Sequence, residues 1–123
     1  MKTILFISLM VFNTLLLASN LGKETYEATC KTCHSSSMSM GIHAPAAFDK
    51  KEWAMRFEKA ATESKNNPTQ FKTAMDYLLY KVSIGKGLMP HGGLCKETMR
   101  SQDKYCSNEA IADAINYMAG VQQ

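Results

Sequence analysis

Two cysteines and a histidine stand together in the segment TCKTCH, residues 29–34. Cys30 and Cys33 are three positions apart, and His34 follows the second cysteine directly. Thiols and an imidazole at this spacing could form half of a zinc site, act as a redox dithiol, or attach a haem. The rest of the chain has to discriminate among these three chemistries.

The zinc interpretation lacks a second half-site. A structural zinc site needs four ligands, which usually come as two pairs at similar short spacings. The other two cysteines, Cys95 and Cys106, are separated by ten residues, and neither His43 nor His91 completes a pair with them. The zinc interpretation therefore stays incomplete.

The dithiol interpretation conflicts with the predicted local structure. Redox dithiols usually lie at a helix N-terminus near a βαβ pattern, where the helix dipole lowers the pKa of the thiol. Here the cysteines fall near the end of a predicted helix, and no strand pattern accompanies them. The dipole at that end disfavours a thiolate, so this interpretation is weak.

The haem interpretation accounts for all three residues. C-x-x-C-H is the attachment signature of c-type haem. Two thiols about one helical turn apart can add to the two vinyl groups along one edge of the porphyrin, and the adjacent imidazole can reach the iron. We therefore expect Cys30 and Cys33 to carry thioethers and His34 to be the proximal ligand.

Met89 is the predicted sixth ligand. It lies in the segment GKGLMPHGG, residues 85–93, where glycines let the chain bend close to a flat ring and Pro90 fixes the backbone. His/Met ligation is a common arrangement in cytochromes c. His91, two residues away in the same segment, is the rival ligand, and His43 is a weaker one. The other methionines beyond residue 19 are less suitable, because they lie in predicted helices, close to His34, or in a polar stretch: Met38, Met40, Met55, Met75, Met99 and Met118.

Residues 1–19 are expected to be a secretory signal peptide. Lys2 precedes a mostly apolar run, and the small residues Ala18 and Ser19 close it. The run is short for a membrane span, although an uncleaved anchor helix is the alternative. Residues 20–123 then form one small domain in an oxidising compartment, where disulfides persist. The formal net charge of +3 is mild and dispersed, which argues against nucleic acid binding.

The pattern beyond residue 19 predicts an all-α fold of about four helices. The first helix covers residues 22–33, with Tyr26, Cys30 and Cys33 on one face, and an irregular loop follows over residues 35–48. The second helix begins at a capping-box-like Asp49 and ends before the segment at residues 66–68.

Two further helices complete the prediction. Thr69 is expected to cap the third, whose inward face would contain Met75, Leu78, Leu79 and Val82. Ser107 is expected to cap the last helix, and Gly120 to end it. The inward stripe of the last helix would contain Ile111, Ala114, Ile115 and Met118.

Taken together, these motifs resemble the class I c-type cytochromes, over nearly the whole chain beyond residue 19. The resemblance rests on CKTCH, on a proline in the following loop, on the GLMP segment and on the final helix EAIADAINYM. Within the class, cytochrome c5 is the most similar subgroup. It shares a tryptophan-bearing helix, here DKKEWAMRFEKA, and two cysteines between the methionine loop and the last helix.

The resemblance implies several residue roles. Residues 20–123 would wrap around one haem c. The carbonyl of Pro45 would accept a hydrogen bond from the ring of His34, and Trp53 would pack near the haem or reach a propionate, although core packing alone would explain this tryptophan. Gly22 and Tyr26 would cross the last helix near Tyr117. The resemblance also pairs Cys95 with Cys106 in a disulfide.

Two features depart from the subgroup's pattern. The cysteines of the later pair usually lie closer together than Cys95 and Cys106, and His91 occupies a place where an apolar or basic residue is more common. The insertion between the cysteines could reshape the haem edge, and His91 adds a titratable group near the haem.

The resemblance implies a periplasmic carrier of single electrons, and no enzyme on its own. Its partners would be a redox donor and an acceptor that bind transiently, with a peripheral approach to membrane-bound redox complexes, and the chain would be a monomer. The alternatives are a haem-bearing subunit of a larger oxidoreductase, and a sensor or peroxidase-like protein with an open sixth site.

Overall fold

The computed structural model describes residues 20–95 and 103–121. Over these ranges the chain is helical, with one isolated bridge between Lys86 and Met89 and no further strand pairing, so the predicted all-α class is confirmed. The expected signal peptide and Met99 lie outside the described residues. No helix in the described ranges is both long enough and apolar enough to span a membrane.

The first helical segment is not the regular helix that the sequence predicts. Helical residues 20–25 lead into a π-helical turn, η1 (Tyr26–Cys30), and then into α2 (Lys31–His34). The hydroxyl of Thr29 donates to the carbonyl of Thr25 at 2.8 Å, and the N–H of Lys31 reaches five residues back to Tyr26. The extra residue in this turn shifts the helical register, so the predicted single face does not continue from Tyr26 to Cys33.

A short helix, α3 (Ser36–Ile42), replaces the start of the predicted loop. Its serines and glycine suggested irregular structure, but the carbonyl of Ser35 accepts from the N–H groups of Met38 and Ser39 and starts a helical turn. The helix ends at His43, which adopts the left-handed conformation at φ 55°. Only the later part of the predicted loop, before Asp49, is irregular.

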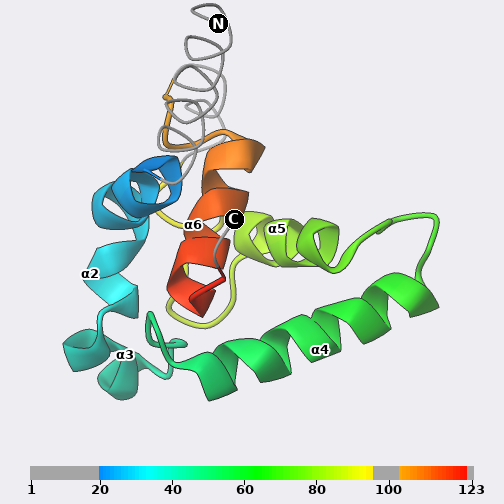
Figure 1. The fold of residues 1–123 in the computed structure, drawn as a ribbon, viewed down its shortest axis with the longest axis horizontal. Helices are drawn as coiled ribbons and strands as arrows, with labels where there is room; N and C mark the ends of the chain where they lie inside the picture. Colours follow the sequence, from blue (N-terminus) through cyan, green and yellow to red (C-terminus); the bar gives the residue numbers. More distant parts are fainter. Residues whose placement is uncertain (1–19, 96–102, 122–123) are drawn as a thin grey trace, which may run out of the picture.

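Two longer helices form an antiparallel pair (Figure 1). The first, α4 (Lys50–Asn66), begins as predicted, because the Asp49 carboxylate accepts from the N–H of Glu52 at 3.1 Å. The second, α5 (Ala74–Ile84), is capped by Thr73 and not by Thr69. The reason is the residue three positions on: Asp76 completes a capping box with Thr73, whereas Lys72 stands at that position for Thr69.

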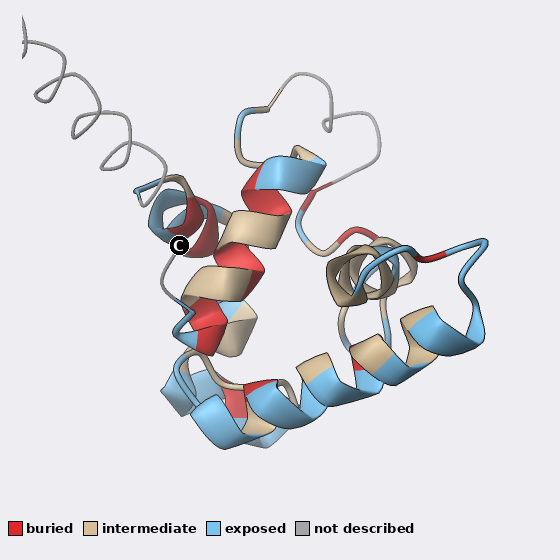
Figure 2. Ribbon diagram, turned by 45° about the vertical axis from the view of Figure 1, so that its right-hand side comes forward, coloured by how far each residue is buried: buried red, intermediate tan, exposed pale blue. Residues whose placement is uncertain are grey.

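The last helix, α6 (Asn108–Ala119), is the centre of the core. Ser107 caps it through the N–H of Ala110, and Gly120 ends it at φ 70°, both as predicted. Figure 2 shows that buried residues concentrate along this helix. Trp53 of α4 and the half-buried inward face of α5 pack against its predicted stripe, which is buried: Ile111, Ala114, Ile115 and Met118.

The N-terminal segment crosses α6 at a glycine. A Cβ atom at Gly22 would stand 2.5 Å from the backbone oxygen of Asp113, so a larger residue would not fit. Next to this crossing, the rings of Tyr26 and Tyr117 are 5.4 Å apart. The predicted crossing of the first and last helices is therefore present, and it fixes the segment that leads to Cys30 and His34.

Candidate functional site

The thiols of Cys30 and Cys33 are free and half-buried at the junction of η1 and α2. Burial raises the pKa of Cys30, and a hydrogen bond with the neighbouring Thr29, at 3.3 Å between Oγ1 and Sγ, offsets this only in part. A thiol with a raised pKa is the opposite of the activated thiolate in a redox dithiol. The structure therefore gives the dithiol interpretation no support.

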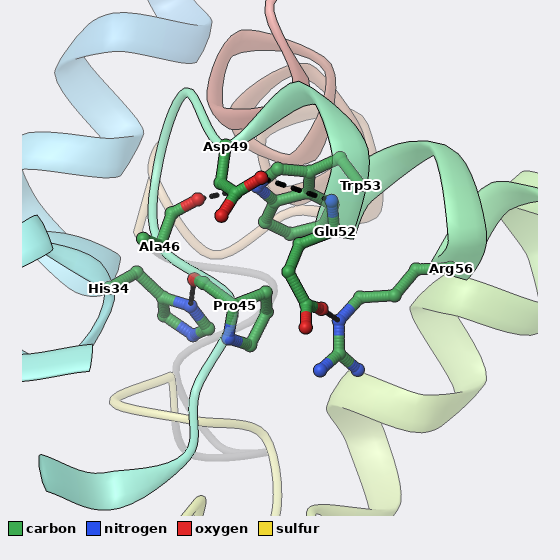
Figure 3. Close-up of polar contacts among 7 residues, drawn as sticks. All are labelled: His34, Pro45, Ala46, Asp49, Glu52, Trp53 and Arg56. Atoms are coloured by element: carbon green, nitrogen blue, oxygen red, sulfur yellow. Dashed lines mark hydrogen bonds and ion pairs between the residues drawn. The ribbon is translucent and has the colours of Figure 1, made fainter. Parts of the chain in front are cut away.

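The loop of residues 43–49 holds the ring of His34 in place. Its Nδ1 atom lies 2.8 Å from the carbonyl oxygen of Pro45 (Figure 3). The same loop is fixed on both sides, because Ala47 donates its N–H to the His34 carbonyl at 2.7 Å and Phe48 donates to the Met118 carbonyl at 2.6 Å. The imidazole is thus oriented by a backbone carbonyl that α2 and α6 keep in position.

The electrostatics of His34 favour a neutral imidazole. Burial lowers its pKa; the hydrogen bond to Pro45 acts in the opposite direction, and the charge of Arg56 lowers the pKa further. Since a carbonyl can only accept, Nδ1 must carry the proton. Nε2 then presents a lone pair, and it has no hydrogen-bond partner within the described part of the chain. A ring fixed at one nitrogen and open at the other is the usual state of a metal-binding histidine.

The ring of Trp53 lies beside that of His34. Its side chain is 5% exposed, and its ring centre lies 6.5 Å from that of His34. Its indole N–H donates to the carbonyl of Ala46 at 2.9 Å (Figure 3). The indole N–H is therefore bonded to the loop and is not free to donate to a propionate. Trp53 could contact a haem only through the carbon atoms of its ring.

Met89 lies at the end of a tight turn that follows α5. Lys86 and Met89 exchange two backbone hydrogen bonds, at 3.1 and 3.0 Å. Gly85 stands at φ 69°, and a Cβ atom there would lie 2.5 Å from the Met89 carbonyl oxygen. Glycine is therefore required at this position, and it lets the turn fold back beside the end of α5.

The thioether of Met89 differs in its environment from the other methionines described. It is half-buried in a loop, whereas Met75 and Met118 pack in the core. The remaining described methionines are at least half exposed: Met38, Met40 and Met55. The rival His91 is exposed, and so is His43. Among the described methionines, Met89 thus combines partial burial with a place in a loop.

Cys95 and Cys106 are paired. Their sulfur atoms lie 2.09 Å apart, the distance of a disulfide, and both residues are buried. These sulfurs are therefore not available to complete a zinc site with Cys30 and Cys33. No cluster of three or more His, Cys, Asp or Glu residues that could hold a metal ion occurs in ranges 20–95 and 103–121.

The donor set suits a covalently attached haem. It combines two free thiols, a neutral imidazole with an open nitrogen, and a half-buried thioether in a loop. Sequence reasoning missed the contributions of Thr29, Ala46 and Ala47. Only Thr29, a hydroxyl residue beside a cysteine and four after Thr25, had a recognisable signal, because Ala46 and Ala47 act through their backbone.

Comparisons with known proteins agree with this donor set. Residues 18–118 match the family model described as cytochrome c oxidase, cbb3-type, subunit III. Cytochrome c-555 of Chlorobaculum tepidum is 34% identical over 104 residues, which cover 80% of this chain and 72% of that protein. No solved structure matches the chain.

Proposed function

Because the chain belongs to the class I c-type cytochromes and carries a covalently bound haem c, we propose that it is a single-haem electron carrier. Cys30 and Cys33 would attach the haem through thioethers, and His34 and Met89 would bind its iron. When bound, the haem supplies an iron that changes between the ferric and ferrous states by one electron.

The observation that carries this proposal is the state of His34 beside two free thiols. The Pro45 carbonyl oxygen accepts a hydrogen bond from Nδ1–H, with 2.8 Å between Nδ1 and the oxygen. The lone pair of Nε2 is therefore available to bind a metal. Burial keeps the imidazole neutral by lowering its pKa. The buried ring of Trp53 lies beside the imidazole, with 6.5 Å between the ring centres.

Met89 as second ligand explains why the chain would carry electrons rather than transform a substrate. With both His34 and the Met89 thioether bound, the iron would have no open site for a substrate, and the thioether would favour the reduced state. The half-buried position of the side chain and the tight turn that presents it support this assignment.

The proposed setting is the periplasm, with a redox donor and an acceptor that bind transiently to a monomer. Support comes from the signal-like residues 1–19 and from the disulfide of Cys95 and Cys106, a bond that persists in oxidising compartments. Contacts of this kind are small and depend on charge, so electron-transfer rates should fall as salt screens them.

The name of the matching family model favours a second candidate function. That model is named for a subunit of an oxidase, so this chain could relay electrons within a larger oxidoreductase. Stable co-purification of native protein with another chain would favour the subunit, whereas a monomeric holoprotein in size-exclusion chromatography would favour the free carrier.

The attachment residues are tested by the pyridine haemochrome assay on matured protein. We expect one c-type haem per chain in the wild type. Cys30→Ala and Cys33→Ala should each shift the haemochrome band, because one vinyl group then stays unreacted. A wild type without the c-type spectrum would contradict the proposal.

The axial assignment is tested by Met89→Ala. We expect loss of the weak long-wavelength band of sulfur-to-iron charge transfer, and rapid binding of carbon monoxide by the reduced protein. Met55→Ala, at an exposed methionine of α4, is the matched control and should keep the band. If the wild type lacks the band and His91→Asn restores it, His91 is the ligand. Rapid carbon monoxide binding by the wild type would instead indicate a sensor or peroxidase-like protein.

A further inference from the structure

The disulfide joins the end of the Met89 loop to the start of α6. Cys95 is the last residue of the described part of this loop, residues 85–95, and its N–H donates to the Gly92 carbonyl at 3.0 Å. Its partner Cys106 stands directly before Ser107, the cap of α6. Both cysteines are almost fully buried, at 2% and 1% exposure. The loop is therefore bonded covalently to the residue that precedes the cap of α6.

A continuous set of contacts leads from Cys95 to the side chain of Met89. The Gly92 N–H donates to Val82 of α5 at 2.9 Å, and the Gly93 N–H donates to the Pro90 carbonyl at 2.9 Å. The methyl carbon of Met89 lies 3.5 Å from the position that a Cβ atom at Gly93 would occupy. The end of the Met89 side chain thus lies beside the backbone of Gly93, in the segment that bonds to Cys95 and to Val82.

Little else in the described loop restrains it. Four glycines adopt positive φ values, between 60° and 75°, and glycine loses the most conformational freedom when it is ordered. Leu88 is 75% exposed and Leu94 53% exposed, and His91 is also exposed, so these side chains contribute little packing. The fixed points are the Lys86–Met89 bridge, the Gly92–Val82 bond and the disulfide.

We propose that the disulfide of Cys95 and Cys106 is a positioning element that keeps the Met89 thioether where it would bind the haem iron. The role rests on the proposed assignment of Met89. Without the covalent link, the end of the loop can move away from α6, and the backbone of Gly92 and Gly93 against which Met89 packs moves with it. Met89 then leaves its position more often, while the fold around α6 persists.

The test compares wild-type holoprotein with the double variant Cys95→Ala/Cys106→Ala. The variant leaves Cys30 and Cys33 for attachment, so the haemochrome assay should still give one haem per chain. We expect a weaker charge-transfer band in the oxidised variant. In the reduced variant, carbon monoxide should bind about tenfold faster or more, which corresponds to about 1.4 kcal/mol in the opening equilibrium. An unchanged band with an unchanged rate would overturn the proposal.

A control separates loop positioning from general loss of stability. Phe71 lies before α5 and packs against the rings of Tyr77 and Tyr80 of that helix, and Phe71→Leu weakens this packing while leaving both cysteines in place. It should lower the unfolding midpoint and leave the carbon monoxide rate unchanged. If it accelerates binding as much as the double variant does, the disulfide has no specific role.

A second measurement needs no variant to fold. Mature wild-type protein is treated with a phosphine, which is oxidised as the disulfide is reduced to two thiols. The thiols are alkylated, and the product is purified and identified by mass spectrometry. It should bind carbon monoxide as the double variant does, and a wild-type rate would contradict the proposal. A missing band in untreated wild type would instead contradict the assignment of Met89 itself.

Discussion

His34 illustrates how the site depends on backbone groups from a distant loop. Its Nδ1 proton is accepted by Pro45, and the next residue, Ala46, accepts the indole N–H of Trp53. The two hydrogen bonds attach consecutive carbonyls of one loop to α2 and α4. Trp53 therefore contributes to the orientation of the imidazole by holding the loop, in addition to packing in the core.

Trp53→Phe tests this contribution. The substitution keeps an aromatic ring but removes the donor to Ala46, so we expect a loss of about 1 kcal/mol in the free energy of unfolding. Trp53→Ala should cost more, about 3–5 kcal/mol, because it also leaves a cavity. Urea unfolding of the holoprotein, followed by circular dichroism, measures both. Equal stability of Trp53→Phe and wild type would show that the hydrogen bond contributes nothing.

The crossing of the first helical segment over α6 is set by one missing side chain. Gly22 lets the backbone approach Asp113 at a distance that a Cβ atom would prevent. Because η1 and α2 continue from this point, the crossing also sets where Cys30 and His34 stand.

Gly22→Ala should destabilise the protein by about 1–3 kcal/mol, because the clash is with backbone and cannot be relieved by a rotamer change. Gly41→Ala is the matched control: this residue lies in α3, and a Cβ atom there meets nothing within 4 Å. The control should be neutral or stabilising by up to about 1 kcal/mol. Thermal unfolding compares the two variant holoproteins. Equal midpoints would show that the close approach of Gly22 to Asp113 is not required for stability.

The capping box at the start of α5 gives a separate test. Thr73→Ala should cost about 1 kcal/mol, because the N–H of Asp76 loses its acceptor. Thr69→Ala should be nearly neutral, since Thr69 lies in the connection before the helix. Urea unfolding compares the two variants. A larger loss in the free energy of unfolding for Thr69→Ala would show that Thr69 caps α5, as the sequence suggested.

These elements show which parts of the fold are readable from sequence. α4 and α6 were predictable because a capping residue precedes an apolar stripe in each of them, which is buried at Trp53 and Ala60 in α4 and along the helix in α6. The π turn was not, because it coincides with one hydroxyl, Thr29, bonding to a backbone carbonyl. α3 was missed because serine and glycine favour loops on average, whereas its first turn depends on Ser35 in context.

The candidate site also contains residues that were predictable from the sequence and residues that were not. Cys30, Cys33 and His34 were evident because covalent attachment requires neighbouring residues of fixed type. The carbonyl of Ala46 carries no sequence signal, so the engagement of the Trp53 N–H could be found only in the structure.

At the scale of the whole molecule, α6 connects the parts that form the site. Segments far apart in sequence meet around it: η1, which leads to His34, the loop with Pro45, whose Phe48 bonds to Met118, and α5, which leads to Met89 (Figure 1). The disulfide attaches the Met89 loop to the start of the same helix. An electron carrier needs such a frame, because an iron whose surroundings move little between redox states exchanges electrons with little reorganisation.

A reductive titration of matured wild-type protein, followed at the sulfur-to-iron charge-transfer band, tests the central claim most directly. The account predicts that the band is present in the oxidised protein and disappears as one electron per chain is added. It should return fully on reoxidation. An oxidised protein without the band, or a band that does not respond to one electron per chain, would contradict the account.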